Sequence, residues 1–528
     1  MPPTFLVLVA ALTVGGLLLR LPSFNDSLFG DEISTYFIVM GNGVGRVLQL
    51  VHSNQETSPP LYFLVAWVTK GWLSSPVQSI RLVSLVTGTA AIPLTFLLGL
   101  WTVGRRAGVV GAACVTLSPF MIFYSSEARP FMLVMFLGLV STLALLRALD
   151  TDRLGWWILY ALATCSAVYT HYTVVFLLVT QLVWALWTRP RRRVALVAAN
   201  VAACLLYIPW LGGLRQDLHA PSFIAALAPV KVHTLELIFE NFWIGHPLIP
   251  ISLLPGRLAV GLAAFGLAVG VLGFVLWART AGRTWWWRLS DRAVLVVALA
   301  VAPAVLVVLY SWARVDVLGG PFLISSWPAF ALAIGALVVC SPSRSVRLIA
   351  ILLVVGAYGV GAADMLGSAP HRPNIDSAVA YIDRVGSSGD PIVSTPYFAN
   401  PMSELDVALA NAGRPEHHPV IRLGSPPLAE QLAPLSRPHP QPQLFGLPLT
   451  PPRVVAKQAV ALARHGTIFF LASDATYPPQ FKSSTDRTRR EFFAALPAGF
   501  HVVEEKTYPS FSGTFPQTLY VIRTTGSG

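Results

Sequence analysis

Residues 131–146 read FMLVMFLGLVSTLALL, a run without a single charged side chain that Arg147 follows closely. A helix needs about 20 predominantly apolar residues to cross a bilayer, because the hydrocarbon core is about 30 Å thick. With its neighbours on both sides, this run reaches that length. Glu127 and Arg129 stand before it, so the stretch predicts a membrane-spanning helix with ionisable residues at both ends.

The rest of the chain repeats this pattern. Of 528 residues, 54% are hydrophobic and only 12% are charged, whereas about a quarter are charged in soluble domains. A soluble enzyme and a protein with a single anchor are therefore excluded, and we expect a polytopic α-helical membrane protein with about eleven spans. The first run, residues 3–19, lacks a basic n-region and a cleavage site, so we expect a retained helix. The spans are centred near residues 12, 90, 116, 139, 163, 180, 204, 265, 302, 331 and 356.

The net charge of +12 would suggest nucleic acid in a soluble chain, but here the arginines cluster in every second connection between apolar runs. This alternation follows the positive-inside rule. It predicts a cytoplasmic N-terminus and places residues 21–79 and everything after Gly367 outside, with no nucleic-acid partner. The preference for Arg over Lys is typical of a GC-rich genome, so we expect a bacterial plasma membrane. The clusters are Arg105/Arg106, Arg147/Arg153, Arg189 with Arg191 to Arg193, Arg279 to Arg292, and Arg344/Arg347.

Acidic residues collect on the opposite, outer connections. Topology depends on Lys and Arg and hardly on Asp and Glu, so this second asymmetry indicates chemistry on the outer face. The inner acids are Asp150, Asp152 and Asp291 only.

The composition divides the chain into two domains. Residues 1–366 are expected to form the membrane domain, with a functional outer loop at residues 21–79. Residues 367–528 alternate helical and strand patterns, with a helix expected at residues 375–385 and strands at residues 391–394, 467–471 and near 519–523. We expect them to form an extracytoplasmic α/β domain. Four cysteines lie in or beside apolar runs without metal-type spacing, so neither a disulfide framework nor a zinc cluster of cysteines is expected.

Three acidic residues in the first outer loop are candidates for catalysis. Asp31 and Glu32 are adjacent, and neighbouring helical side chains point about 100° apart, so one can face a cavity while the other packs. Glu56 follows in the same loop, shortly before Pro59. One of these carboxylates could be a general base, and the alternative is a set of ordinary surface acids.

Further ionisable or polar residues stand at the outer ends of later spans. Glu127 and Arg129 are either a structural ion pair or part of a site, because ionisable groups at a membrane edge need a partner or water. Arg81 is suited to a phosphate, or alternatively snorkels to the interface. His171 and Tyr172 could donate hydrogen bonds to a phosphate or a sugar, or cap a helix.

Histidines give weaker signals. His233, Glu236, Glu240 and His246 suit a metal by residue type, but their spacing matches no metal motif. The pair His417-His418 in the C-terminal domain, together with Asp474, is interpreted as ordinary surface residues.

Taken in order, these motifs resemble the GT-C class of integral-membrane glycosyltransferases, in the branch of the protein O-mannosyltransferases and the lipid A aminoarabinose transferases (glycosyltransferase families 39 and 83). The resemblance covers residues 5–190 well and the rest in layout. Near residue 324 the branch would have Arg-Tyr, whereas this chain has Ile324-Ser325-Ser326-Trp327-Pro328, and Arg314 is a candidate substitute. The motifs that carry the resemblance are Asp31-Glu32, Glu56 with Pro59-Pro60-Leu61-Tyr62-Phe63, Arg81-Leu82-Val83-Ser84, Tyr124 to Arg129, and His171-Tyr172.

The resemblance implies inverting transfer of a sugar from a polyprenyl-phosphate donor to a glycan, lipid or protein acceptor at the outer face. Asp31 would be the general base, with Glu32 and Glu56 as further catalytic acids. Glu32 and Glu56 are also the candidates for a divalent metal ion, the one cofactor that some relatives use. Arg81, Glu127, Arg129, His171, Tyr172 and Arg314 would bind the donor phosphate and the substrate.

Two other functions stay open at this point. A transporter or flippase of lipid-linked sugar precursors would also place ionisable groups in the membrane, but near mid-span and often with inverted repeats. A sensor or assembly protein would use the outer α/β domain and would not need the ordered loop motifs.

Overall fold

The computed structural model describes residues 3–53, 56–219, 232–281, 290–314, 317–368, 370–395, 402–413, 417–423, 450–474, 479–513 and 516–524. The chain forms two compact units. Unit 1 consists of Met1–Phe24, Gly43–Thr69 and Ile80–Leu366, and unit 2 of Asn25–Asn42, Lys70–Ser79 and Gly367–Gly528. Unit 2 thus takes two pieces of the loop at residues 21–79, which the sequence predicts to lie outside, in addition to the C-terminal residues.

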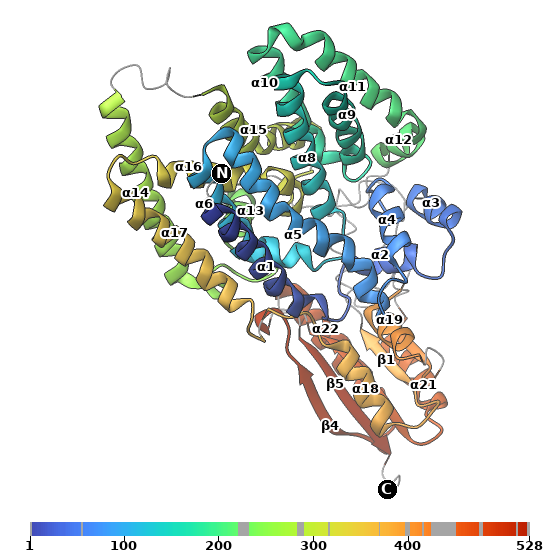
Figure 1. The fold of residues 1–528 in the computed structure, drawn as a ribbon. Coiled ribbons are helices and arrows are strands. Elements are labelled where there is room, and N and C mark those ends of the chain that lie inside the picture. Colours follow the sequence, from blue (N-terminus) through green and yellow to red (C-terminus); the bar gives the residue numbers. More distant parts are fainter. Residues whose placement is uncertain are drawn as a thin grey trace. The chain divides into compact units, whose positions relative to one another are not determined.

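Unit 1 is helical (Figure 1). Eight helices among the described residues are long and apolar enough to cross a membrane, or nine if one bent pair is a single span. Two shorter apolar helices, Leu154–Val168 and Tyr172–Thr188, lie at two further positions where the sequence predicts spans. A polytopic helical membrane protein is confirmed, while length and composition support fewer spans than the eleven predicted. The helices of unit 1 are α1 (Pro3–Phe24), α3 (Val44–His52), α4 (Leu61–Thr69), α5 (Pro76–Thr102, whose first turn belongs to unit 2), α6 (Arg105–Leu117), α7 (Pro119–Ser125), α8 (Phe131–Thr151), α9 (Leu154–Val168), α10 (Val175–Thr188), α11 (Arg193–Tyr207), α12 (Leu211–His219), α13 (Val232–Trp243), α14 (Arg257–Ala281), α15 (Asp291–Ala313), α16 (Trp327–Val339) and α17 (Arg344–Asp364).

The bent pair is α6 and α7, which meet at 60°. Pro119 has no N–H, so it cannot donate the helical hydrogen bond that the carbonyl of Val115 would accept. The buried Arg20 of α1 replaces it: Nη2 donates to the Val115 carbonyl at 3.0 Å, and Nε donates to Ser125 Oγ at 2.9 Å. Arg20 therefore has a structural role. It stabilises the bend between α6 and α7 and holds Ser125, which lies shortly before Arg129.

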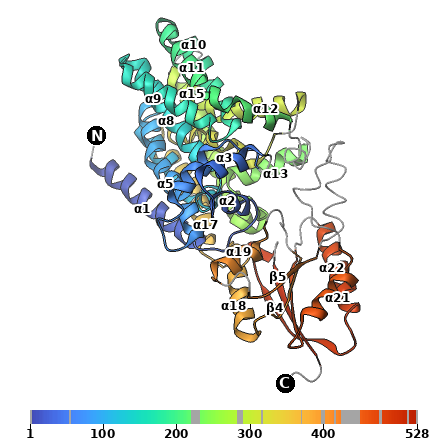
Figure 2. The same ribbon diagram turned by 90° about the vertical axis from the view of Figure 1, so that its right-hand side faces the viewer.

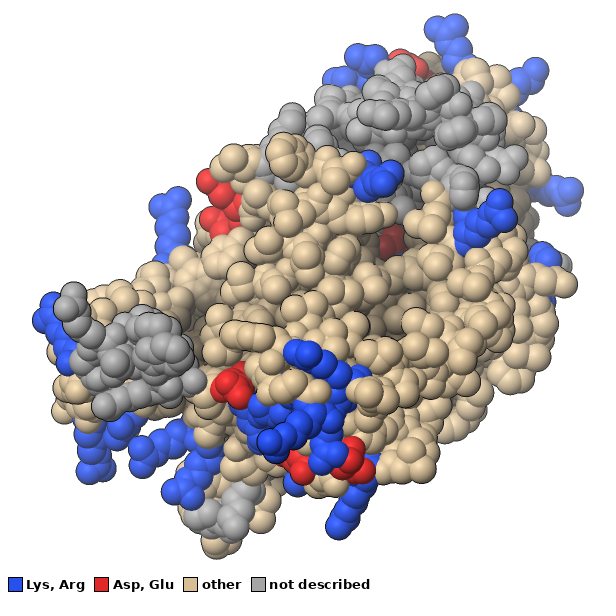
Figure 3. Space-filling model, turned by 90° about the horizontal axis from the view of Figure 1, so that it is seen from above, with Lys and Arg blue, Asp and Glu red and all other residues tan. Residues whose placement is uncertain are grey.

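One face of unit 1 collects the arginines that the sequence places on alternate connections. Figure 3 shows Lys and Arg side chains gathered on the face that carries the connection between α10 and α11, with few acidic side chains among them. The three acids that the sequence places there each pair with an arginine. The pairs are Arg189–Asp291 at 2.9 Å, Arg292–Asp150 at 2.5 Å, and Arg192–Asp152.

Unit 2 is an α/β unit in three layers (Figure 2). Its sheet has the order β2-β1-β3-β5-β4, in which β1, β2 and β3 are parallel and β5 runs antiparallel to β3 and β4. In β1, Ile392 packs on the face with α18 and α19, and its neighbour Val393 packs on the opposite face with α21 and α22. The alternation of side chains along a strand thus builds two cores. The elements are α2 (Glu32–Val39), α18 (Ile375–Val385), β1 (Ile392–Thr395), α19 (Glu404–Asn411), β2 (Val420–Arg422), α21 (Pro452–Leu462), β3 (Thr467–Ser473), α22 (Pro479–Ala494), β4 (Phe500–Tyr508) and β5 (Gln517–Thr524).

Candidate active site

The centre of the candidate site in unit 1 is a buried ion pair between Glu56 and Arg129. Arg129 Nη1 lies 2.5 Å from Glu56 Oε2, and Nη2 donates to Oε1 at 3.2 Å. Oε1 also accepts hydrogen bonds from the backbone N–H groups of Thr57 and Ser58, at 3.0 and 3.2 Å. The guanidinium and the carboxylate therefore meet edge to edge, in the bidentate geometry that fixes both orientations.

This environment decides the charge of Glu56. Burial by itself would raise the pKa of its carboxyl, but the charge of Arg129 and the hydrogen bonds from Arg129, Thr57 and Ser58 outweigh burial and lower the pKa. Glu56 is therefore ionised at neutral pH. It is a weak base, because Arg129 and the hydrogen bonds stabilise its charged form.

The backbone around Arg129 is held by residues from two other motifs of the resemblance. Ser84 Oγ donates to the Arg129 carbonyl at 3.2 Å, and the hydroxyl of Tyr62 lies 3.1 Å from Ser84 Oγ. Arg81 is completely buried, and its Nη1 donates to the carbonyl of Phe24 at 3.1 Å. Motifs that are far apart in sequence therefore form one network, and the alternative of a snorkelling Arg81 is wrong.

His171 belongs to the same region. It is buried, and burial together with the positive charge of Arg129 lowers its pKa to about 4, although Glu56 acts in the opposite direction. The imidazole is therefore neutral at pH 7. Its Nδ1 lies 2.9 Å from Thr173 Oγ, which donates to the Phe322 carbonyl at 2.9 Å, and the Phe322 ring packs at 5.1 Å from the imidazole. Phe322, two residues before the stretch that departs from the resembled branch, thus lies beside His171.

Tyr172 pairs with an acid that the sequence does not single out. Its hydroxyl donates to Asp217 Oδ2 at 2.5 Å and accepts a hydrogen bond from Trp210 Nε1 at 3.2 Å. Asp217 lies in α12 and is buried. From sequence it is one of many outer acids, and only its approach to Tyr172 distinguishes it.

An apolar cavity of about 740 Å³ opens next to these residues. The backbone N–H of Leu61, shortly after Glu56, donates to the carbonyl of Tyr169, shortly before His171, at 3.0 Å, and both residues line the cavity. The cavity can therefore take a hydrocarbon chain or an aromatic ring. Its lining comes from Leu48, Gln49, His52, Pro60, Leu61, Leu64, Tyr169, Pro209 and Trp210.

Asp31 and Glu32 belong to unit 2, where they start α2. Gly30 precedes them with a φ of 64°, a conformation that glycine adopts without strain. Glu32 is completely buried and forms an ion pair with the buried Arg372 at 3.3 Å, whereas Asp31 is exposed. The sequence does not reveal Arg372, because it lies far along the chain after the last span.

The remaining predicted residues lie at the edge of these groups. Glu127 is partly buried, and its carbonyl accepts from the backbone N–H of Arg129 at 2.8 Å. Arg314 is exposed at the end of α15, and Asp316 lies outside the described residues.

The two carboxylates named as metal candidates each pair with a buried arginine, and a metal ion at either of them stays a prediction. Glu32 pairs with Arg372, and Glu56 with Arg129, so an arginine already balances each charge. His233 and Glu236 form an exposed pair at 3.8 Å, while His246 is buried and packs against Phe123 at 4.8 Å. Among the described residues, side chains at metal-ligand spacing occur in unit 2, at Asp383, His417 and His418.

The interpretation of His417-His418 as surface residues is wrong for His418. This residue is 2% exposed, and its ring packs edge-on against that of Phe469 in β3, with the ring centroids 6.1 Å apart.

Comparisons with known proteins confirm the resemblance that the sequence predicts. Residues 57–212 match the family described as dolichyl-phosphate-mannose-protein mannosyltransferase. This segment contains Arg81, Glu127, Arg129, His171 and Tyr172, and Glu56 directly precedes it. No curated protein sequence matches the chain significantly.

Solved structures show the same fold along almost the whole chain. ArnT from Cupriavidus metallidurans in the apo state has 14% sequence identity and a TM-score of 0.51, over 98% of this chain and 97% of that chain. The Archaeoglobus fulgidus oligosaccharyltransferase tethered to an acceptor peptide has 11% identity and a TM-score of 0.50, over 98% and 74%. AglB from the same archaeon, in complex with an inhibitory peptide and a dolichol-phosphate, has 10% identity and a TM-score of 0.50, over 97% and 74%.

Proposed function

We propose that the protein transfers a sugar, with inversion at the anomeric carbon, from a polyprenyl-phosphate donor to a glycan, lipid or protein acceptor at the outer face of a bacterial plasma membrane. The observation that carries this proposal is that the mannosyltransferase family match, residues 57–212, contains the buried residues around Arg129. The same fold holds a dolichol-phosphate in the archaeal AglB.

The topology follows from the arginine face. We infer eleven spans, counting the bent pair α6–α7 and the helices α9 and α10 that fall below full spanning length. The paired arginine clusters then lie in the cytoplasm, and residues 21–79 and 367–528 lie outside. Residues 1–366 act as the membrane domain, and residues 367–528 act as an extracytoplasmic domain.

Unit 1 supplies the donor side of the reaction. The apolar cavity accommodates the first isoprene units of the donor, because its walls are almost entirely hydrocarbon and it opens next to the segment that follows Glu56. Arg81 and Arg129 provide positive potential for the donor phosphate, and Glu56 holds Arg129 in position. The neutral imidazole of His171 and the hydroxyl of Tyr172 offer hydrogen bonds to the sugar or phosphate. Glu127 and Arg314 are the other two residues that bind the donor phosphate or the substrate.

Asp31 is the general base. A base must be reachable by the acceptor, and the side chain of Asp31 is exposed, whereas Glu32 is buried against Arg372. In the reaction, the acceptor O–H gives its proton to the Asp31 carboxylate as its oxygen attacks the anomeric carbon. The bond between this carbon and the phosphate oxygen breaks on the opposite face, and polyprenyl phosphate leaves with the electron pair.

The test is a donor panel. Purified protein is incubated with polyprenyl-phosphate sugars, including the mannosyl donor, and release of polyprenyl phosphate is measured for the wild type and for Asp31→Asn. We expect turnover with at least one donor, loss of turnover in Asp31→Asn, and an inverted anomeric configuration by NMR. Lipid movement across proteoliposomes without sugar release would indicate a flippase and overturn the proposal, and full turnover in Asp31→Asn would overturn the assignment of the base.

A further inference from the structure

Three parallel strands of unit 2 begin at the same end of the sheet, and each is preceded by a titratable residue. Asp390 stands before β1, His417 and His418 stand before β2, and His465 stands before β3. The β1 and β2 connections are tied together, because the N–H of Gly389 donates to the His417 carbonyl at 2.9 Å. Asp383, in the last turn of α18, lies at the same end of the sheet. The parallel register thus gathers acids and imidazoles from separate parts of the chain.

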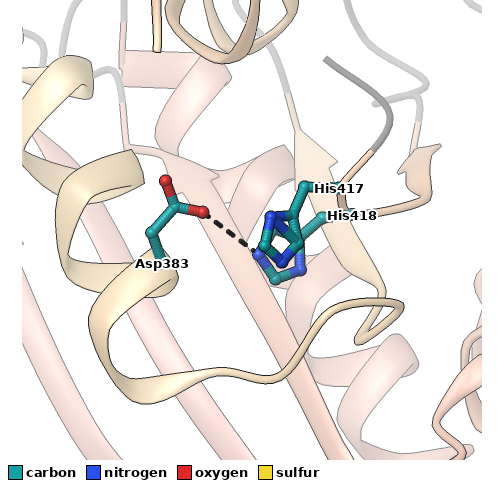
Figure 4. A group of neighbouring side chains, drawn as sticks. All are labelled: Asp383, His417 and His418. Carbon is teal, nitrogen blue, oxygen red and sulfur yellow. Dashed lines mark ion pairs between the residues drawn. The ribbon is translucent and has the colours of Figure 1, made fainter. Parts of the chain in front are cut away.

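Three of these side chains have the spacing of metal ligands. One ligand atom each from Asp383, His417 and His418 lies within 4.8 Å of the other two. His418 Nε2 faces Asp383 Oδ1 at 3.3 Å, and the two imidazole rings stack at 4.8 Å with planes only 11° apart (Figure 4). All three side chains therefore reach one small volume.

A second observation points to a ligand in that volume. The His418 side chain is 1% exposed, and its Nδ1 lies 2.9 Å from the Asp390 carbonyl. This carbonyl only accepts, so Nδ1 is the donor of that hydrogen bond, and the other ring nitrogen, Nε2, faces Asp383. Both Nε2 and Asp383 Oδ1 are buried without a hydrogen-bond partner. Buried polar atoms normally have a bonding partner, so two such atoms side by side point to a ligand that both of them bind.

We propose that Asp383, His417 and His418 bind a divalent transition-metal ion of the zinc type. Two imidazoles and one carboxylate form a ligand set typical of Zn²⁺, and the carbonyl behind His418 orients the ring as outer partners of metal-bound histidines do. Tetrahedral coordination brings ligand atoms to about 3.3 Å from one another. The His418–Asp383 pair is already at this distance, and His417, which is partly exposed, closes the remainder by a side-chain rotation.

The ion has a structural role. In open α/β sheets, substrates bind beyond the carboxyl ends of the strands, and this group lies at the amino ends of β1 and β2. An ion here cross-links α18 to the segment before β2. It stabilises unit 2 independently of the transfer reaction.

The test measures the metal directly. Full-length protein in detergent is treated with a chelator, desalted, incubated with Zn²⁺ or Co²⁺ and desalted again. Elemental analysis gives the metal content, and the visible absorption of Co²⁺ reports the coordination. We expect one retained ion per chain, a tetrahedral Co²⁺ spectrum, and a higher unfolding midpoint on metal addition.

Two variants and one control make the result specific. Asp383→Asn and His417→Gln change partly exposed residues, so we expect both variants to fold, and each is expected to lose the retained metal and the Co²⁺ spectrum. His501→Gln changes an exposed histidine of β4 in the same unit and is expected to retain both. Equal metal content in the wild type and both site variants, or no retained metal in the wild type, would overturn the proposal and leave a plain His418–Asp383 ion pair.

Discussion

Glu56 of unit 1 and Asp31 of unit 2 both belong to the loop after the first predicted span, and the structure places the two carboxylates in opposite environments. Glu56 is buried and bound edge to edge by Arg129, which lowers its pKa. Asp31 is exposed at the start of α2, whereas its neighbour Glu32 is buried. A carboxylate that holds an arginine is a poor proton acceptor, so the comparison supports a structural role for Glu56 and the proposed proton transfer to Asp31.

The largest expected effect is on catalysis at Asp31. Asp31→Asn keeps the size and removes the base, and a positioned base contributes about 10² to 10⁴ in rate. We expect the transfer rate to fall by that factor while the thermal unfolding midpoint stays within 1 °C of the wild type. If Asp31→Asn lowered the unfolding midpoint as much as Glu56→Gln does, the difference in role between the two residues would be disproved.

Glu56→Gln is expected to act on stability first. It leaves the guanidinium of Arg129 buried beside a neutral amide, and breaking a buried pair on one side costs about 3–5 kcal/mol. We expect a lower unfolding midpoint in detergent, measured by intrinsic fluorescence. Glu236→Gln, at an exposed position, is the matched control and should melt like the wild type.

Acid provides a second measure of the Glu56–Arg129 pair. Because the folded state lowers the pKa of Glu56, the pair stabilises the protein above the ordinary pKa of a glutamate, about 4.3, and this stabilisation is lost as the pH falls through the folded pKa. The gap between the wild type and Glu56→Gln should therefore shrink below pH 4. A gap that is constant down to pH 3 would argue against the ion pair.

Arg20→Met should have a smaller effect of the same kind. Methionine has a long side chain without donors, so the Val115 carbonyl at the bend between α6 and α7 loses its partner, at a cost of about 1–3 kcal/mol. We expect a reduced unfolding midpoint and, because Arg20 also holds Ser125, a reduced transfer rate. Arg106→Met, at an exposed position, serves as the control, and equal behaviour of the two variants would remove the structural role of Arg20.

The smallest expected effect concerns His371 in unit 2. Its Nδ1 lies 2.6 Å from Asp26 Oδ1, and this hydrogen bond raises the pKa of His371. A raised pKa means that the pair stabilises the folded state fully below the ordinary histidine value of about 6.5, and that this is lost as the pH rises through the folded pKa. Partly exposed pairs contribute about 1 kcal/mol or less.

We therefore expect the unfolding midpoint of the wild type to exceed that of His371→Gln at pH 6 and to approach it above pH 8. The measurement is a pH series of thermal unfolding on both proteins. A difference that grows with pH would have the wrong sign for this pair.

Much of the fold can be predicted from the sequence because its signals are local. Apolar runs such as residues 131–146 mark helices directly, and Ile375–Val385 is found as a helix with the predicted bounds. The strands β1, β3 and β5 are also anticipated, whereas β2 and β4 are not. β2 has three residues inside a proline-rich stretch, and β4 carries charged side chains on exposed positions, so neither shows the apolar pattern of a strand.

The residues that are missed at the candidate sites share one property. Arg372, Asp217 and His418 gain their meaning from partners that are tens of residues or more away in the chain, and nothing in their own neighbourhood marks them. Arg20 is different, because a single charged residue in an apolar helix is a local signal that could have identified it.

The sequence by itself determined the class of this protein: a polytopic membrane chain with arginines on alternate connections and acids opposite, whose ordered motifs resemble the GT-C glycosyltransferases. These properties depend on composition and on the order of short motifs, which a linear reading contains. Only the tertiary structure decided which carboxylates are neutralised, as Glu56 and Glu32 are, and which stays exposed, as Asp31 does. The physical reason is that the charge state and the reactivity of a carboxylate depend on burial and on the cation beside it, and that cation comes from a distant part of the chain.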